Sequence, residues 1–256
     1  MKEPHTEDSV RKLYGLIGKD ISYSFSRTYF NEKFQHLRLN DCRYVNFDLP
    51  SIEDFDTIVA PNLDRIAGLN VTIPYKEKIM SFLDEIDPEA EKIGAVNTIK
   101  IYPDGRLKGY NTDVFGFENS LMQKLSPEHK SALVLGTGGA SKAVAFVLEK
   151  LGISYRFVSR RESGTNVLTY KDLDKSVIDS YQVIVNSTPL GTFPNIETKP
   201  DLPYEYLGSS HLLFDLIYNP AKTAFLLEGE KRGAKILNGS KMLEMQADRA
   251  WVLWNS

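Results

Sequence analysis

At residues 132 to 141 the chain reads Ala132-Leu133-Val134-Leu135-Gly136-Thr137-Gly138-Gly139-Ala140-Ser141. The four apolar residues predict a buried strand of a parallel sheet, and the glycines lead directly into a predicted helix over 142–151. In such a loop Gly136 permits the tight turn, Gly138 lets the backbone approach a pyrophosphate, and the small Ser141 allows close helix packing. The stretch therefore predicts a dinucleotide-binding α/β unit, in which the cofactor contacts are Gly136, Thr137, Gly138, Gly139 and Ala140.

The second strand of this unit indicates which dinucleotide it binds. The strand is predicted over 155–159 and is followed directly by two arginines. An NAD site usually has an acidic residue at this place to hold the ribose 2′-hydroxyl, whereas arginine pairs with the 2′-phosphate of NADP. We therefore predict NADP as the cofactor, held in part by Ser159, Arg160 and Arg161. The alternative is a solvated pair of surface arginines.

Three further strands are expected over 183–186, 212–216 and 235–237, with helices over 223–232 and 239–254. Ligands of an open α/β sheet lie beyond the carboxyl ends of its strands. The ends of the first two of these strands and the loops that follow them, at 186–191 and 215–220, should therefore border the cofactor. They contain Thr188, Pro189 and Leu216.

The N-terminal part of the chain has two serines in a loop before a predicted helix. A strand is expected over 13–17, and Ser26 is a plausible N-cap for a helix over 27–37. Ser24 and Ser26 would then present two hydroxyls at a helix N-terminus, a place that favours a carboxylate or phosphate. Simple helix capping is the alternative for both residues. A second strand and a second helix are expected over 42–49 and 51–62.

A lysine follows the next predicted strand, which covers 70–73. The chain continues Pro74-Tyr75-Lys76, and proline suits the first turn of a helix because its missing N–H would be unpaired there. An ammonium group is disfavoured at a helix N-terminus, so this position favours a reactive acid or base. A solvated surface lysine is the far commoner alternative.

A predicted hairpin leads to an aspartate at the start of another helix. The strands are expected over 95–101 and 106–110, joined by a turn with the sequence Pro103-Asp104-Gly105. Asp113 follows the hairpin and precedes a helix predicted over 114–125. On local pattern alone, ordinary helix capping explains Asp113.

The composition narrows the functional class. The chain has 256 residues and a formal net charge of -3, without a basic run that would mark a nucleic-acid or membrane surface. Its polar start is unlike a signal peptide, and no apolar stretch approaches the roughly 18 residues of a spanning helix. The single cysteine, Cys42, fits a reducing cytoplasm, and the four histidines lack metal-ligand spacing. We expect a cytoplasmic protein with a small-molecule substrate, no metal, and no nucleic-acid or membrane partner.

Taken in order, these motifs resemble the shikimate dehydrogenase family from about Leu13 to Trp251. The family's Ser-x-Ser matches Ser24 and Ser26, and its Asn-Val-Thr-x-Pro-x-Lys is present in full at 70–76. Its other motifs follow at the expected distances, at 94–98, 111–113, 136–141, 160, 186–189, 215–218 and 242–246.

The resemblance implies an α/β fold with two domains. Residues 1–113, completed by 239–256, would bind the substrate, and residues 114–238 would form a Rossmann-type domain that binds NADP. The implied activity is the NADPH-dependent, reversible reduction of 3-dehydroshikimate to shikimate in aromatic amino acid (chorismate) biosynthesis. The implied assembly is a monomer or a homodimer.

The resemblance also implies roles for particular residues. Lys76 and Asp113 would be the catalytic pair, and Ser24 and Ser26 would contact the substrate carboxylate. The ring would be held by Asn70, Thr72, Asn97, Tyr218 and Gln246. Gly239 and Met242, near the start of the last helix, would complete the cofactor site.

Five residues depart from the family's usual pattern. Tyr23 and Arg27 stand where histidine and proline flank the two serines, and Asp20 stands where proline is common. Val114 replaces a common glycine, and Lys241 replaces a second glycine near the nicotinamide. These changes bear on affinity for the substrate carboxylate and for the cofactor.

Three alternatives remain open from the sequence. A quinate/shikimate dehydrogenase could accept quinate or prefer NAD, although the two arginines argue against NAD. A folate-linked dehydrogenase of similar architecture would have no need for the serine pair. A non-catalytic sensor could bind dinucleotide or shikimate, but the retention of both Lys76 and Asp113 disfavours it.

Overall fold

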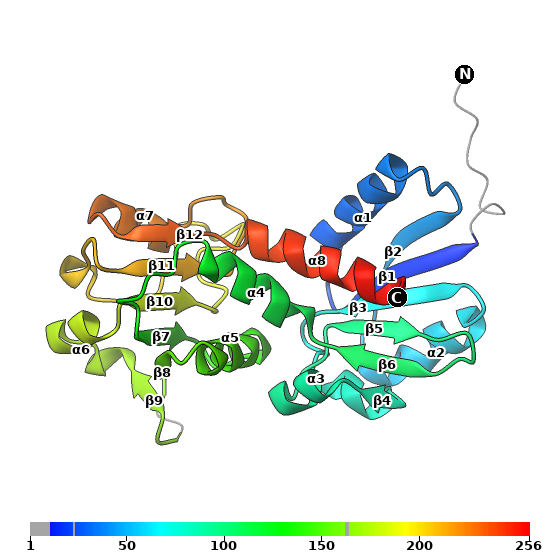
Figure 1. Cartoon of the computed structure of the whole chain (residues 1–256), viewed down its shortest axis with the longest axis horizontal. Coiled ribbons are helices and arrows are strands. Elements are labelled where there is room, and N and C mark those ends of the chain that lie inside the picture. The colour runs from blue at the N-terminus through cyan, green and yellow to red at the C-terminus, as the bar shows by residue number, and fades with distance from the viewer. Residues whose placement is uncertain (1–10, 23, 162–163) are drawn as a thin grey trace. The chain divides into compact units, whose positions relative to one another are not determined.

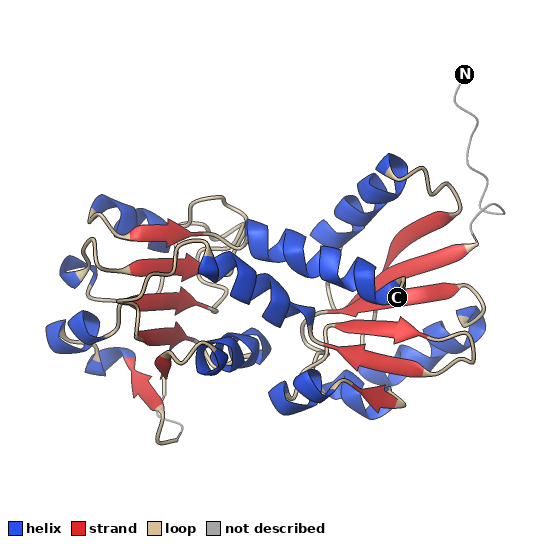
Figure 2. Ribbon diagram, viewed as in Figure 1, coloured by secondary structure: helices blue, strands red, loops and turns tan. Residues whose placement is uncertain are grey.

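The computed structural model of the chain describes residues 11–22, 24–161 and 164–256 (Figures 1 and 2). It divides into two compact units, each with its own six-stranded sheet. The first unit contains the described residues up to Thr112 together with Ala247–Ser256, and the second is Asp113–Gln246. The division runs through the last helix, whereas the sequence-based boundaries place that whole helix in the first domain. The α/β fold class is confirmed by both sheets and by the helices that pack on them.

The first unit has a mixed sheet in the order β2-β1-β3-β5-β6-β4. Strands β1, β2 and β3 are parallel, and β5 and β6 form the expected antiparallel hairpin. The elements of this unit are β1 (Lys12–Gly18), α1 (Phe25–His36), β2 (Cys42–Asp48), η2 (Ile52–Asp54), α2 (Phe55–Val59), η3 (Ala60–Asn62), β3 (Ile66–Val71), η4 (Lys78–Phe82), β4 (Glu85–Ile86), α3 (Pro88–Ile93), β5 (Thr98–Ile101) and β6 (Leu107–Tyr110).

Both faces of this sheet are buried. Since alternate residues of a strand point to opposite sides, each strand contributes side chains to both faces. One face packs on α2 and η4 through side chains such as Ile17, Leu69 and Ile99. The other face carries an aromatic cluster that we call the α1/α8 cluster. It contains Tyr14, Phe30, Phe34, Tyr44, Ala247, Ala250 and Trp254. The C-terminal part of helix α8 (Ser240–Trp254) therefore returns to this unit, as predicted.

The second unit has an all-parallel sheet in the order β12-β11-β10-β7-β8-β9. Four of its strands, β7, β10, β11 and β12, are seen pointing the same way in Figure 1. This is the doubly wound order of a Rossmann-type fold, in which the switch point lies between β7 and β10. Its elements are α4 (Thr112–Met122, which begins at the last residue of the first unit), β7 (Ser131–Leu135), α5 (Gly139–Lys150), β8 (Ser154–Ser159), β9 (Val167–Thr169), η5 (Tyr170–Asp172), α6 (Lys175–Ser180), β10 (Val183–Asn186), η6 (Tyr204–Tyr206), β11 (Leu212–Asp215), α7 (Ala224–Lys231), β12 (Lys235–Leu237) and the start of α8.

The sequence-based prediction of one helix over 51–62 was wrong. The structure has three short segments there, η2, α2 and η3, and Pro61 lies in the last of them. Four other elements, β4, α3, β9 and α6, were missed. Helix α3 had a clear signal, because Asp87 caps it through Glu89 N–H, Pro88 opens it and Gly94 ends it with φ 72°.

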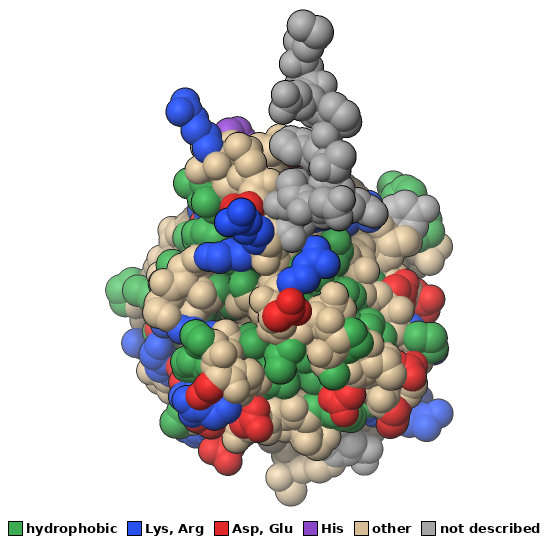
Figure 3. All heavy atoms as spheres, turned by 90° about the vertical axis from the view of Figure 1, so that its right-hand side faces the viewer, with side chains coloured by type: hydrophobic (Ala, Val, Ile, Leu, Met, Phe, Trp, Pro, Cys, Tyr) green, Lys and Arg blue, Asp and Glu red, His purple; other side chains and the backbone are tan. Residues whose placement is uncertain are grey.

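The surface has a mixed character. Figure 3 shows acidic and basic side chains interspersed among apolar ones on one face of the molecule. Among the described residues, no helix combines the length and apolarity that crossing a bilayer requires. Within the same residues, no group of three or more His, Cys, Asp or Glu side chains is placed to hold a metal ion.

Candidate functional site

Lys76 lies in a turn and not in a helix, which corrects the sequence-based prediction. Pro74 follows a cis peptide bond, and Tyr75 N–H donates to Thr72 O at 2.9 Å, so the chain turns before any helix can begin. The 3₁₀ helix η4 starts only at Lys78. The prediction that a helix N-terminus makes Lys76 reactive is therefore wrong, and the role of Lys76 depends on its neighbouring residues instead.

Residues 95–98 are hydrogen-bonded both to Lys76 and to the residues that directly precede Asp113, all within the first unit. Val96 N–H donates to the Lys76 carbonyl at 2.8 Å. Thr112 N–H donates to Asn97 Oδ1 at 2.7 Å, and Asn111 Nδ2 donates to the carbonyl oxygen of residue 95 at 2.9 Å. Asp113, the next residue, is buried in the first turn of α4 and begins the second unit.

The serine loop also differs from the prediction, because Ser24 and not Ser26 is the N-cap of α1. Ser24 Oγ accepts from Arg27 N–H at 3.4 Å. Ser26 lies in the first helical turn and is buried close to Tyr44 on β2, where its side chain partly offsets the rise in the pKa of Tyr44 that burial causes. The cap moved by two residues because a contact with a distant strand draws Ser26 inward, which local pattern does not reveal.

Asn70 and Asn97 are buried within one polar network, and Thr72 directly follows β3. Asn70 Oδ1 accepts from Tyr44 Oη at 2.8 Å. Asn97 Oδ1 accepts from Thr98 Oγ1 at 3.1 Å as well as from Thr112. The backbone N–H of Thr72 donates to Ile17 O at 2.8 Å, which places Thr72 beside the first loop. The sequence analysis missed Tyr44 and Thr98, whose alternating β-strand pattern signals only burial.

The departures from the family pattern have separate explanations. Asp20 has φ 57° and donates its N–H to Asp48 Oδ1 at 2.9 Å, and a proline could do neither. The side chain of Arg27 is exposed, and that of Lys241 pairs with Glu244 at 3.0 Å on the surface. Val114 is buried in α4. Tyr23 lies outside the described residues.

The glycine loop contains two kinds of glycine. Gly136 has φ 102°, and a Cβ there would lie 3.1 Å from both Ser187 Oγ and Thr188 Cγ2, so the fold itself requires glycine. Gly138 has φ -83°, and a Cβ there would meet nothing within 4 Å; the same open space surrounds Gly139. These two residues leave a cradle that a Cβ would fill, as close approach by a pyrophosphate requires. Ser141 is buried and its Oγ donates to Gly138 O at 2.5 Å, which closes the helix onto the loop.

The two arginines lie at the carboxyl end of β8, as predicted. Both are exposed, and Arg161 N–H donates to Ser159 Oγ at 3.4 Å. Burial raises the pKa of Tyr170, and the positive charge of Arg160 partly offsets that rise. Arg160 therefore lies near the aromatic side chain that follows β9.

A buried carboxylate, Asp215, holds the two loops beyond β10 and β11. It accepts from Asn186 Nδ2 at 3.1 Å, from Ile217 N–H at 3.0 Å and from Thr223 Oγ1 at 2.5 Å. Asn186 Oδ1 in turn accepts from Thr188 N–H at 3.0 Å and from its hydroxyl at 2.7 Å. This network organises the loop that contains Thr188 and Pro189, and the loop that contains Leu216 and the partly exposed Tyr218.

Asp215 should make stability depend on pH. Burial raises its pKa to about 6, with the three neutral donors lowering it in part. The folded state thus binds more protons than the unfolded state between about pH 4 and pH 6, and this group's contribution to stability falls by about 2 kcal/mol as the pH rises through that window.

Urea unfolding of the wild type and Asp215→Asn at pH 4 and pH 7 measures this effect. The wild type should lose about 2 kcal/mol relative to the variant between the two values, because the amide does not titrate. An equal difference at both pH values would show that Asp215 does not titrate in this window.

The remaining predicted residues lie around the start of α8. A Cβ on Gly239 would collide with the carbonyl of Leu216, so the loop after β11 and this helix start require glycine. Met242 is buried, and its carbonyl oxygen would lie 2.5 Å from a Cβ on Gly116 of α4. Gln246 is the last residue of the second unit and is partly buried.

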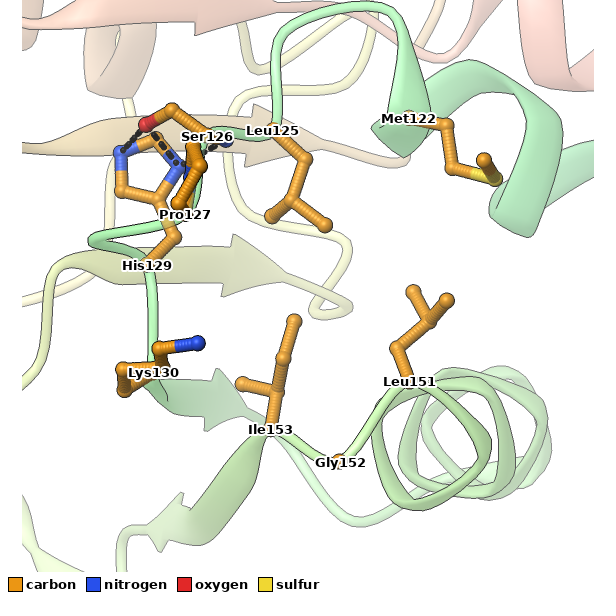
Figure 4. Close-up of a pocket in the computed structure, with 9 residues that line it drawn as sticks. All are labelled: Met122, Leu125, Ser126, Pro127, His129, Lys130, Leu151, Gly152 and Ile153. Atoms are coloured by element: carbon orange, nitrogen blue, oxygen red, sulfur yellow. Dashed lines mark hydrogen bonds between the residues drawn. The ribbon is translucent and has the colours of Figure 1, made fainter.

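A cavity of about 320 Å³ lies elsewhere in the second unit, between the end of α5 and the loop before β7 (Figure 4). Leu125, Leu151 and Ile153 point into it, and His129 lies at its edge. His129 Nδ1 accepts from Ser126 N–H at 3.1 Å, and burial lowers the pKa of its imidazole. His129 therefore serves as the acceptor of a turn, at the end of the sheet opposite the glycine loop.

Comparison with known proteins links these features to one family. Residues 16–99 match the family model described as the shikimate dehydrogenase substrate binding domain. Over 96% of the chain and 93% of the relative, the sequence is 38% identical to shikimate dehydrogenase (NADP(+)) of Methanococcus maripaludis.

Two solved structures are also similar to this chain in sequence and in fold. The shikimate 5-dehydrogenase of Thermus thermophilus, in complex with NADP(H) and shikimate, is 31% identical, with a TM-score of 0.83 over 95% of this chain and 93% of that one. A quinate dehydrogenase of Corynebacterium glutamicum, in complex with NAD, is 26% identical, with a TM-score of 0.83 over the same shares.

Proposed function

Because the chain belongs to the shikimate dehydrogenase family, we propose which of its residues carry out the family's reaction. The protein is an NADP-dependent oxidoreductase that reversibly reduces 3-dehydroshikimate to shikimate in aromatic biosynthesis. We propose that the first unit binds the substrate and that the second binds NADP. The boundaries proposed for these functions are residues 1–113 with 239–256, and residues 114–238.

Lys76 and Asp113 are the proposed catalytic pair. NADPH, when bound, supplies the hydride for reduction of the ring ketone. The ammonium of Lys76 donates a proton to the alkoxide oxygen, and in the reverse direction its neutral amine removes the hydroxyl proton. Asp113 orients the amine and the reacting hydroxyl. The observation that supports this pairing is the segment 95–98, which binds the backbone of both Lys76 and Thr112.

We also propose which groups hold the substrate. Ser24 and Ser26 donate to the carboxylate, and polar side chains bind the ring hydroxyls. These are Asn70, Thr72, Asn97, Tyr218 and Gln246. Ser24 keeps its own hydroxyl proton when its oxygen accepts from Arg27 N–H, so it remains a donor for a carboxylate.

The proposed cofactor contacts lie beyond the carboxyl ends of β7, β8, β10 and β11. They are Gly136, Thr137, Gly138, Gly139 and Ala140 at the pyrophosphate, Ser159, Arg160 and Arg161 at the 2′-phosphate, and Thr188, Pro189 and Leu216 in the neighbouring loops. Gly239 and Met242, at the start of α8, complete the set. The open space above Gly138 and Gly139 supports this placement.

Gly138→Ala tests the cradle. The backbone at Gly138 suits any residue and a Cβ meets nothing, so the variant should keep the melting temperature of the wild type. Its KM for NADP should rise by about tenfold or more, because the methyl group fills the space for the pyrophosphate. Gly136→Ala is the contrasting variant, since its positive φ makes alanine destabilising. An unchanged KM for NADP in Gly138→Ala would contradict the cradle.

The reaction itself is tested by loss of NADPH absorbance when purified protein is mixed with 3-dehydroshikimate. Shikimate with NADP should give the reverse reaction. A protein that binds both ligands without turnover would instead be a sensor.

The likeness to a quinate dehydrogenase that binds NAD gives a second candidate function. Kinetics with shikimate and quinate, each with NADP and NAD, separate the two. The arginines after β8 favour shikimate with NADP as the best combination.

We further propose a cytoplasmic location and a monomer or homodimer. The lone Cys42 fits a reducing compartment. Sedimentation at several protein concentrations distinguishes the two assemblies.

A further inference from the structure

The hydroxyl of Tyr44 joins two residues that the proposed function places at the substrate. Tyr44 lies on β2, is 1% exposed, and stacks on Phe30 with ring centroids 4.7 Å apart. Its hydroxyl donates to Asn70 Oδ1 at 2.8 Å and lies close to the side chain of Ser26. A residue of β2 thus connects α1 to the end of β3.

A backbone carbonyl, that of Asn97, fixes which groups donate and which accept in the hydrogen bonds of Asn70. Asn70 Nδ2 donates to Asn97 O at 3.3 Å, and a carbonyl oxygen can only accept. The amide of Asn70 is therefore oriented with Oδ1 towards Tyr44, which must donate. Since Tyr44 has a single proton, its oxygen can act only as an acceptor towards the nearby Ser26.

The network ends on the amide of Asn97. Asn70 Nδ2 also contacts Thr98 Oγ1 at 3.2 Å, and Thr98 Oγ1 donates to Asn97 Oδ1 at 3.1 Å. Thr112 adds two donors to the same oxygen, its N–H at 2.7 Å and its hydroxyl at 3.1 Å. These donors all bind Oδ1 of Asn97, and they therefore determine the orientation of its amide group.

We propose that Tyr44 is a positioning residue for substrate binding: its hydroxyl sets where the Ser26 oxygen lies and which way the Asn70 and Asn97 amides face. The Ser26 proton can turn towards an arriving carboxylate, whereas the Tyr44, Asn70 and Asn97 part of the network keeps its arrangement. This inference rests on the proposed function, because it takes shikimate as the substrate.

Tyr44→Phe removes only the hydroxyl, and Tyr14→Phe is its matched control. Tyr14 is the register partner of Tyr44 on β1, is also 1% exposed, and belongs to the same α1/α8 cluster. Burial raises the pKa of Tyr14, and the nearby Cys42 and Asp41 raise it further. Loss of general packing should therefore affect both variants equally.

The expected result for Tyr44→Phe is a KM for shikimate raised by about tenfold, because Asn70 Oδ1 loses its donor in a buried site. The KM for NADP and the kcat should stay within about threefold, and Tyr14→Phe should leave all three values within about twofold of the wild type. In an Asn70→Ala background, Tyr44→Phe should add less than about twofold, since the partner is already gone.

Other outcomes overturn the inference. An unchanged KM for shikimate in Tyr44→Phe would do so, as would equal rises in both KM values or an equal effect of Tyr14→Phe. Calorimetric Kd values for shikimate separate this test from the reaction itself. If the wild type binds shikimate without turnover, the proposed function fails and the Kd of Tyr44→Phe still tests the network. A wild type that does not bind shikimate would end both proposals.

Discussion

Replacing Lys76 with alanine should lower kcat by about 10² to 10⁴, the range expected for loss of a positioned acid or base. The KM for shikimate should change much less, because the lysine acts mainly on the proton that moves in the reaction. Steady-state kinetics in both directions measure the effect. Wild-type turnover in Lys76→Ala would show that the proton is carried by another group.

Two further variants distinguish a role of Lys76 in proton transfer from a role of its positive charge. Lys76→Arg keeps the positive charge, but a guanidinium does not release its proton, so this variant should lose nearly as much turnover as alanine. Lys78→Ala removes an exposed lysine two residues later and should leave kcat within about twofold of the wild type. If Lys76→Arg retained most of the turnover, the role of Lys76 would be electrostatic.

Replacing Arg160 with alanine should raise the KM for NADP by about ten- to one hundredfold. Hydrogen bonds to charged groups contribute about 1.5 to 3 kcal/mol, and a 2′-phosphate carries close to two negative charges. The KM for NAD should change by less than about threefold, since its ribose has no phosphate for the guanidinium to hold. Turnover at saturating NADP should be nearly unaffected.

Arg161→Ala is the neighbouring control. Adjacent side chains diverge, so it should raise the KM for NADP less than Arg160→Ala does. Equal losses with NADP and NAD in Arg160→Ala would mean that this arginine acts structurally and that the preference for NADP arises elsewhere.

Much of the second unit could be predicted from short stretches of sequence. A strand, a glycine loop and a helix occur consecutively at 131–150, and their hydrogen bonds and packing involve near neighbours. The place of Arg160 could be predicted for the same reason, because it directly follows a strand. The prediction was wrong at 51–62, where a proline interrupts the helical signal. It missed β9, α3 and α6, which are only three to six residues long.

The sequence by itself determined the α/β class, the parallel nucleotide-binding unit and the order of the family's motifs, because apolar periodicity and turn residues act over a few positions. Only the tertiary structure decided that Ser24 caps α1, that Lys76 lies in a turn, and that the Tyr44 hydroxyl donates to Asn70. Tyr44 and Asn70 are 26 positions apart in the chain, and the backbone of Lys76 is hydrogen-bonded to the distant Val96, so these contacts form only when the strands of the first sheet lie side by side.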